Sequence, residues 1–114
     1  MIFTLNAPMF DFLVLAIIDR HDTYGYEISQ TIKQVSNTKD STLYPVLKRL
    51  QEKGCVTTYD EQFQGRNRKY YRITDNGRII CDEWRKEWSA YRAGIDRIAN
   101  CANEGGAEGG NEND

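Results

Sequence analysis

The sequence predicts a mainly α fold with a small β-hairpin, in the order helix, helix, helix, hairpin, helix. Three observations lead to this prediction. Apolar residues recur at helical spacing as far as Leu50. Two short runs rich in β-branched and aromatic residues, 56–59 and 69–73, then flank a polar loop, as the strands of a hairpin do. Helical spacing returns after Thr74. This order is that of a winged helix-turn-helix followed by a long C-terminal helix.

The first predicted helix, residues 9–18, is apolar nearly all round and is interrupted only by Asp11. Pro8 suits its first turn, where the missing N–H costs nothing. A helix without a polar face has to be covered on several sides. A chain of 114 residues has room for one core, so a second subunit is a plausible cover. The residues expected to face that subunit are Met9, Phe12 and Leu13.

The second predicted helix begins after the polar connector 19–23, with Asp22 or Thr23 as its cap. Its apolar positions follow the i, i+4, i+7 pattern of one helical face. We expect these positions to face the core: Ile28, Ile32 and Val35.

The third predicted helix follows the break at 36–40 and ends before Gly54, a typical C′ residue. Because proline is tolerated only in the first turn of a helix, Pro45 places the cap at one of the three residues Asp40, Ser41 and Thr42. The face expected to point inward consists of Leu43, Leu47 and Leu50. The opposite face, free to point outward, consists of Thr42, Tyr44, Pro45 and Lys48.

The hairpin is expected to turn at Gly65. Side chains alternate across a strand, so at least one of Tyr70 and Tyr71 is expected in the core. Thr74 is the expected cap of the final helix, which runs from about Asp75 to Asn100. Its apolar residues alternate at spacings of three and four, the seam of a coiled-coil-like pair. They are Cys81, Trp84, Trp88, Tyr91, Ile95, Ile98 and Ala102.

These elements divide the chain into three parts. Residues 1–74 form the N-terminal helix and the winged helix-turn-helix, 75–101 form a dimerisation helix, and 102–114 form a disordered acidic Gly-rich tail. The dimer seam of the helix consists of Trp84, Trp88, Tyr91, Ile95 and Ile98.

Charge is distributed unevenly along the chain, whose formal net charge is −2. Four acids and no base lie in the tail: Glu104, Glu108, Glu112 and Asp114. Residues 39–72, by contrast, hold eight bases and four acids, a local excess of +4. The bases are Lys39, Lys48, Arg49, Lys53, Arg66, Arg68, Lys69 and Arg72. Such a local excess is the footprint of a surface that binds phosphates.

Several classes of function are excluded by composition. Three cysteines, Cys55, Cys81 and Cys101, are too few and too far apart for a disulfide framework, so we expect reduced thiols; a redox role for Cys101 is the alternative. His21 is the only histidine and no Cys-x-x-Cys occurs, so no metal or other cofactor is expected. The sequence has neither a nucleophile paired with a base nor a phosphate-binding loop, so we do not expect an enzyme. No apolar run suits a membrane span and no basic leader is present, which indicates a cytoplasmic protein.

Three blocks carry a resemblance to a known family: YGYEI at 24–28, STLYPVLKRL at 41–50 and GRNRKYYRIT at 65–74. In this order and spacing they resemble the PadR family of bacterial transcriptional regulators. The single short C-terminal helix is similar to the small-subunit branch that includes LmrR-like multidrug regulators. Asn67 departs from the family, in which proline or glycine is common at that place.

The resemblance implies a homodimeric repressor that places two recognition helices in successive major grooves of double-stranded DNA. We therefore expect DNA contacts from the third helix and the hairpin, called the wing below. They are Lys39, Ser41, Thr42, Tyr44, Pro45, Lys48, Arg49, Arg66, Asn67, Arg68, Lys69 and Arg72. For Tyr44, packing on the surface of the domain is an alternative, and Arg49 and Lys53 can equally be solvated charges.

The resemblance also implies a ligand site at the dimer interface, where a tryptophan at the place of Trp88 helps to sandwich flat aromatic effectors. The residues expected to line it are Phe10, Val14, Trp84 and Trp88. An ordinary packed dimer core is the alternative for the two tryptophans. For the whole chain, the alternative function is a winged-helix interaction module that does not bind DNA specifically.

Overall fold

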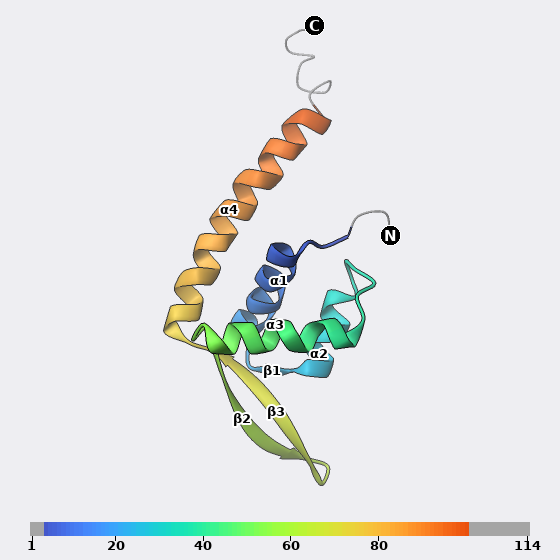
Figure 1. Cartoon of the computed structure of the whole chain (residues 1–114), viewed down its shortest axis with the longest axis vertical. Coiled ribbons are helices and arrows are strands. Elements are labelled where there is room, and N and C mark those ends of the chain that lie inside the picture. The colour runs from blue at the N-terminus through green and yellow to red at the C-terminus, as the bar shows by residue number, and fades with distance from the viewer. Residues whose placement is uncertain (1–3, 101–114) are drawn as a thin grey trace, which may run out of the picture. The chain divides into compact units, whose positions relative to one another are not determined.

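The computed structural model describes residues 4–100, so the predicted tail and Cys101 lie outside the described residues. Within this range the elements follow the predicted order, which confirms the mainly α fold with a small hairpin. They are α1 (Ala7–Arg20), β1 (Thr23–Tyr24), α2 (Gly25–Ile32), α3 (Asp40–Glu52), β2 (Val56–Phe63), β3 (Arg66–Ile73) and α4 (Asp75–Ala99), as Figure 1 shows. None of the helices in 4–100 combines the length and the apolar character that a bilayer crossing requires.

α1 begins earlier and ends later than the apolar run that predicted it. Asn6 caps it, because the Asn6 Oδ1 accepts a hydrogen bond of 2.9 Å from the backbone N–H of Met9. Pro8 lies in the first turn, as expected. One side of the helix lies in the core of the protein, and its buried residues are Phe10, Val14, Leu15, Ile17 and Ile18.

The start of the second helix differs from the prediction. Thr23 does not cap α2: it lies in β1, where it pairs with Tyr71, and Tyr24 pairs with Tyr70. Strand pairing bonds the backbone of Thr23. The Thr23 hydroxyl donates to the carboxylate of Glu27. α2 ends at Ile32, so Val35 lies beyond the helix and is 52% exposed instead of buried.

α3 begins at Asp40, with Lys39 at the N-cap and no side-chain cap. The expectation that Pro45 lies in the first turn is therefore wrong, because five helical residues precede it. A proline here leaves the Ser41 carbonyl without its usual i+4 donor. Ser41 and Pro45 are both exposed, so water can bond this carbonyl. The inward face is as predicted, with Leu43, Leu47 and Leu50 buried.

The wing is longer than the two predicted strands. β2 and β3 pair in register from Val56 with Ile73 to Phe63 with Arg66, and β1 adds to the other edge of β3. The two-residue turn is Gln64-Gly65, with φ of 51° and 78°, the positive pair that suits tight hairpins. Arg66, Asn67 and Arg68 therefore lie in a strand and not in a loop. Apart from Phe63, their end of the hairpin is polar, so no hydrophobic alternation marked it.

Two compact units divide the described chain, the first ending at Asp82 and the second beginning at Glu83. The first unit extends past the predicted boundary at Thr74, since Gly77 and Cys81 of α4 are buried in it. Thr74 caps α4 as predicted: its hydroxyl accepts from the Gly77 N–H at 2.9 Å and donates to the Gly54 carbonyl at 2.6 Å.

The core of the first unit joins the three helices, the base of the wing and the first turns of α4. Its fully buried side chains include Leu15, Ile18, Ile28, Leu47, Leu50, Val56, Cys55 and Cys81. Neither of these two cysteines forms a disulfide, and burial raises the pKa of Cys55, which disfavours the reactive thiolate. Within 4–100, no cluster of His, Cys, Asp and Glu could hold a metal ion.

The second unit, within the described residues, is the helical segment 83–99 of α4. The rings of Trp88 and Tyr91 lie one helical turn apart with centroids 6.0 Å from each other. Further along the same helix Tyr91, Ile95 and Ile98 are 57%, 46% and 80% exposed. Their spacing places these apolar side chains along one side of the helix.

Candidate nucleic-acid interface

The outer face of α3 is open to solvent along the whole helix. All the α3 residues that the sequence predicted to contact DNA are exposed: Ser41, Thr42, Tyr44, Pro45, Lys48 and Arg49. Tyr44 is 62% exposed, so most of its side chain is open to solvent. The face therefore offers hydroxyls, an aromatic ring and a lysine on a rigid helix.

The orientation of α3 relative to α2 is fixed by a small polar cluster. Asp40, at the first position of α3, accepts a hydrogen bond of 2.5 Å from the Ser29 hydroxyl and pairs with Lys33 at 3.3 Å. The hydrogen bond from Ser29, and after it the contact with Lys33, lowers the pKa of the Asp40 carboxyl. These contacts join the two helices at the end of α3 where its outward face begins.

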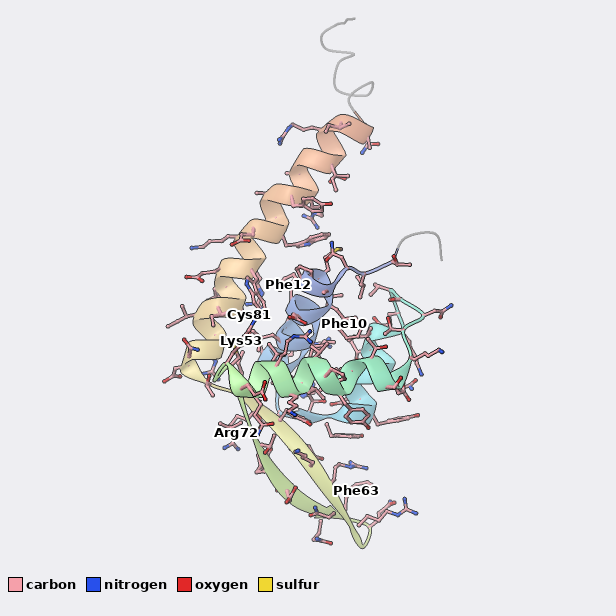
Figure 2. All side chains as sticks on the ribbon, viewed as in Figure 1. Phe10, Phe12, Lys53, Phe63, Arg72 and Cys81 are labelled. Carbon is pink, nitrogen blue, oxygen red and sulfur yellow. The ribbon has the colours of Figure 1, made fainter. Side chains whose placement is uncertain are left out.

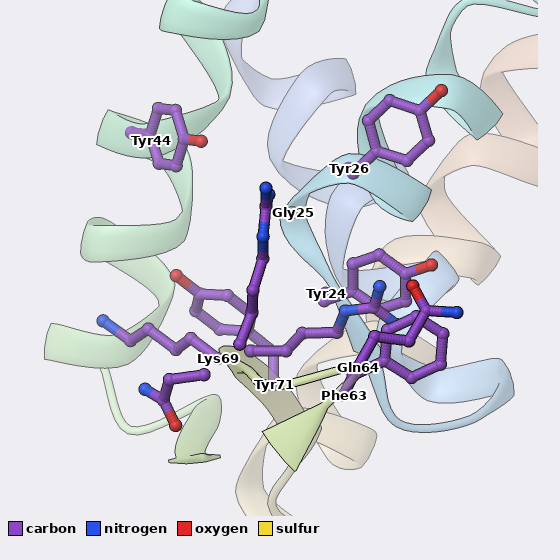
Figure 3. Close-up of a pocket in the computed structure, with 11 residues that line it drawn as sticks. Tyr24, Gly25, Tyr26, Tyr44, Phe63, Gln64, Lys69 and Tyr71 are labelled. Carbon is purple, nitrogen blue, oxygen red and sulfur yellow. The ribbon is translucent and has the colours of Figure 1, made fainter. Parts of the chain in front are cut away.

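A groove of about 870 Å³ lies between α3, the start of α2 and the wing. Figure 3 shows Tyr44 and Tyr26 at its upper sides, with Lys69 and Tyr71 below them. Its lining residues are Tyr24, Gly25, Tyr26, Tyr44, Phe63, Gln64, Arg66, Asn67, Arg68, Lys69 and Tyr71. Three of them are cationic and none is acidic, so the groove is electropositive although the whole chain is not.

Arginines and aromatic rings alternate along one face of the wing. The guanidinium carbon of Arg68 lies 4.0 Å from the ring centroid of Tyr24 and 3.9 Å from that of Phe63. Tyr70 packs edge-on against Tyr24 at 5.4 Å and stacks on Tyr59 at 5.5 Å. These contacts tie the hairpin to the strand that leads into α2.

At the base of the wing, Asp22 holds two side chains from the two long strands. The Tyr59 hydroxyl donates to Asp22 Oδ2 at 2.7 Å and the Arg72 Nε donates to the same oxygen at 3.1 Å, while Arg72 also lies 4.7 Å from the Tyr59 ring centroid. The Tyr59 hydrogen bond, helped by Arg72, lowers the pKa of Asp22. The same bond to Asp22 raises the pKa of Tyr59.

The predicted cations therefore differ in their surroundings. Arg49 pairs with Asp11 at 2.6 Å and Arg72 pairs with Asp22, so each already has an acidic partner. Figure 2 shows Arg72 at the base of the wing and Phe63 toward its tip. Four other predicted cations are exposed and form no ion pair within residues 4–100: Lys39, Lys48, Arg66 and Lys69. These four have no acidic partner to compete with an external anion.

Several residues that line the groove were not predicted from the sequence. Tyr24, Tyr26, Phe63 and Gln64 line the groove, although none was named as a site residue. The signal was available for Phe63: once Gln64-Gly65 is taken as a two-residue turn, Phe63 must face Arg66 across the hairpin. Tyr24 and Tyr26 flank the start of α2, which becomes visible only when β1 joins the sheet.

The first-helix half of the predicted ligand site needs correction. Phe10 and Val14 are 6% and 0% exposed, because both side chains pack into the core of the first unit. They leave almost no surface for a ligand in this conformation. The residues of α1 expected to face a second subunit, by contrast, are only partly buried: Met9, Phe12 and Leu13.

Comparisons with known proteins agree on one family. Residues 14–83 match the transcriptional regulator PadR-like family. A Streptococcus mutans UA159 protein of known crystal structure has a TM-score of 0.84 at 47% identity, over 88% of this chain and 94% of that one. A PadR family transcription regulator from Clostridium difficile R20291 scores 0.72 at 30% identity, over 79% and 97%. Bacillus subtilis PadR, solved with operator DNA, scores 0.60 at 26% identity, over 65% of this chain and 45% of that chain.

Proposed function

Because this chain belongs to the PadR-like family of transcriptional regulators, which are not enzymes, we propose that it binds operator DNA as a homodimeric repressor. In this proposal α3 enters the major groove and the wing contacts the neighbouring phosphate backbone. The observation that carries it is the groove between α3 and the wing, which is lined by Arg66, Arg68 and Lys69 and by no carboxylate. The likeness to Bacillus subtilis PadR, solved with operator DNA, supports the same function.

The dimensions and chemistry of α3 suit the major groove. Its 13 residues span about 20 Å, and the groove of B-DNA admits one α-helix. Lys48 can donate to guanine O6 and N7, while Tyr44 and Pro45 offer apolar contact to thymine methyl groups. Lys39, Ser41 and Thr42 are exposed at the start of α3, Asn67 is exposed on the wing, and all four are proposed to contact phosphates.

A homodimer is proposed from the apolar side of α4. Exposed Tyr91, Ile95 and Ile98 would be costly in water, and a second copy of the helix would cover them. Residues 75–101 then act as the dimerisation helix, with Met9, Phe12 and Leu13 of α1 completing the contact. Such a dimer would present two α3 helices to half-sites one helical turn of DNA apart.

An effector site is proposed at the same interface, as in the small-subunit, LmrR-like branch. Trp84 and Trp88 lie one turn apart on α4, and flat rings of this kind bind planar aromatic molecules by stacking. A molecule bound there in the cytoplasm would change the separation of the two α3 helices and so lower the affinity for DNA. By linkage, DNA would weaken binding of the molecule by the same factor.

Lys48→Ala tests the role of α3 in a gel-shift titration against the chain's own upstream DNA. We expect at least about a tenfold loss of affinity, since a good contact of this kind is worth about 1–3 kcal/mol. Lys86→Ala, which removes an exposed lysine of α4, is the matched control and should bind as the unaltered protein does. Equal affinity of all three proteins would remove α3 from the interface, and no binding by any of them would favour a protein-interaction module.

A further inference from the structure

The guanidinium of Arg68 lies close to two aromatic rings that come from two different strands. Tyr24 comes from β1 and Phe63 from the last position of β2, and their ring centroids lie 4.0 and 3.9 Å from the guanidinium carbon. The cation is therefore in contact with both rings. Each contact is attractive, and cation–π contacts strengthen as water is removed.

The edge of this guanidinium has no partner in the described part of the chain. Arg68 forms no hydrogen bond or ion pair there, although Glu61 is its cross-strand neighbour. Arg49 and Arg72, by contrast, each donate to an aspartate. A guanidinium has five N–H donors, all in the plane of the group. Arg68 therefore binds an acceptor through that edge.

The position of the edge suits an anion that enters the groove. Arg68 lines the groove together with Arg66 and Lys69, and Tyr44 of α3 lines the opposite wall. Arg66 and Lys69 are exposed, and Lys69 lies only loosely, at 5.8 Å, over the ring of Tyr71. Ordering a free lysine or arginine on DNA costs rotamer entropy, and a side chain that is already held in place loses less of it on binding.

We propose that Arg68 is a preordered phosphate receptor, which takes one DNA phosphate in a bidentate contact through its guanidinium edge, and that Tyr24 and Phe63 are positioning residues for it. This inference rests on the proposed DNA-binding function. Two parallel N–H donors match two phosphate oxygens, a geometry that lysine cannot supply. The rings of Tyr24 and Phe63, called the clamp below, thus make Arg68 the dominant phosphate contact of the wing. Arg66 and Lys69 are not held in this way.

The test uses fluorescence anisotropy of the full-length protein with a duplex from its own upstream region, measured at several salt concentrations. Arg68→Gln should weaken binding at least about tenfold and reduce the slope of log K against log [salt] by about 0.9 per subunit, the value for one lost phosphate contact. Arg68→Lys should weaken binding by a similar factor without changing the salt slope. The positive charge is kept in this variant, but the two parallel N–H donors of the guanidinium are lost. Arg92→Gln, an exposed arginine of α4, should change neither quantity.

Phe63→Leu tests the clamp itself. It removes one ring and keeps an apolar side chain, so we expect weaker binding at an unchanged salt slope and an unchanged thermal midpoint. A merely structural role of Phe63 would instead lower the midpoint. Rescue by Phe63→Tyr, which restores a ring, would support positioning of the cation, and failure of that rescue would count against it.

Duplexes with single methylphosphonate substitutions locate the phosphate without altering the protein. We expect one neutralised phosphate per half-site that weakens the unaltered protein about tenfold and leaves the Arg68→Gln variant unaffected. If no phosphate is coupled to Arg68 in this way, or if 7-deazaguanine substitution shows the coupling instead, the inference is wrong. Failure of the unaltered protein to bind any duplex would overturn the proposed function itself, an outcome distinct from the two above.

Discussion

Gly77 lies where the start of α4 packs tightly against the chain that precedes the wing. A Cβ built on it would lie 2.1 Å from the Cys55 carbonyl oxygen and 2.8 Å from Ile73 Cγ1. The first of these neighbours is backbone and cannot rotate away. The absence of a side chain is thus what lets the capped start of α4 lie against Cys55, below the base of the wing.

We expect Gly77→Ala to destabilise the protein by about 1–3 kcal/mol, the usual cost of forcing a methyl group into a packed site, although alanine is otherwise the better helix former. Urea unfolding followed by circular dichroism measures this cost. Asn76→Ala is the matched control, because Asn76 is exposed and its one hydrogen bond, to the Lys53 carbonyl, is long at 3.5 Å; its effect should stay within about 0.5 kcal/mol. A Gly77→Ala protein as stable as the control would mean that α4 packs less closely than described.

The surroundings of each arginine separate the arginines with an acidic partner in this chain from those proposed to bind DNA. Arg49 and Arg72 were both expected at DNA from their position in charged segments. In the fold each donates to an aspartate, and those aspartates, Asp11 and Asp22, are distant in sequence. No local pattern could have revealed these pairs, because they form only when α1 and the connector after it pack beside α3 and the wing.

At the scale of elements, the wing is attached at its base by Asp22, Tyr59 and Arg72. The pKa of Asp22 is lowered below its ordinary 3.8, so its contribution to stability is present above that pH and is lost as the pH falls through the folded value. The pKa of Tyr59 is raised above 10.0, so the stability that its hydrogen bond adds is present below pH 10.0 and is lost as the pH rises further.

Asp22→Asn should therefore be less stable than the unaltered protein at neutral pH, and the difference should narrow below pH 3.8. The free energy of unfolding of both proteins, measured in urea from pH 7 down to about pH 3, tests this expectation. Comparing the two proteins cancels the other groups that titrate in the same range, Asp40 among them. A difference that stays constant across this range would mean that the Asp22 charge does not stabilise the wing.

Among the elements, α4 carries the proposed dimer and effector site. Trp88→Ala should lower the stability of the dimer in sedimentation equilibrium and abolish the quenching of tryptophan fluorescence by planar aromatic compounds. The ring of Trp88 lies 6.0 Å from that of Tyr91, so its loss removes packing as well as a stacking surface. Ser89→Ala, at the adjacent exposed position, is the control. Unchanged quenching in the Trp88 variant would exclude the ligand site.

Elements with a buried apolar face could be predicted from the sequence, and strand residues held by pairing alone could not. The spacing of Leu43, Leu47 and Leu50 predicted α3 because burial of one helical face leaves a periodic pattern. β1, only two residues long, is held by the edge of β3 and leaves no such pattern. The outer half of the wing was missed for the same reason, since its strands continue through polar residues as far as the Gln64-Gly65 turn.

The candidate site was predicted in part. The outward residues of α3 and the cations of the wing were identified by charge and helical spacing, and the structure brings Tyr44, Arg68 and Lys69 to one groove. The aromatic clamp on Arg68 was not foreseen, because Tyr24 and Phe63 meet only after the sheet has formed. Phe10 and Val14 were expected at a ligand site but are buried in the core. A helix that is apolar nearly all round has no sequence pattern that shows which of its sides the domain itself will cover.

For the whole molecule, the distribution of charge matters more than its sum. A protein with a net charge of −2 would be expected to bind DNA weakly. The lining of the groove between α3 and the wing, however, contains no acidic residue. DNA binding driven by these cations must be strongly salt-dependent, because each neutralised phosphate releases counterions.

The most direct test is the salt dependence of binding to the chain's own upstream DNA. Four cations proposed to contact phosphates, Lys39, Arg66, Arg68 and Lys69, would neutralise about eight phosphates in a dimer, so log K should fall against log [salt] with a slope of about −7. Fluorescence anisotropy from about 50 to 200 mM salt covers the useful range. A slope of that size would support DNA binding through α3 and the wing. A slope near zero, or no binding at the lowest salt, would contradict it.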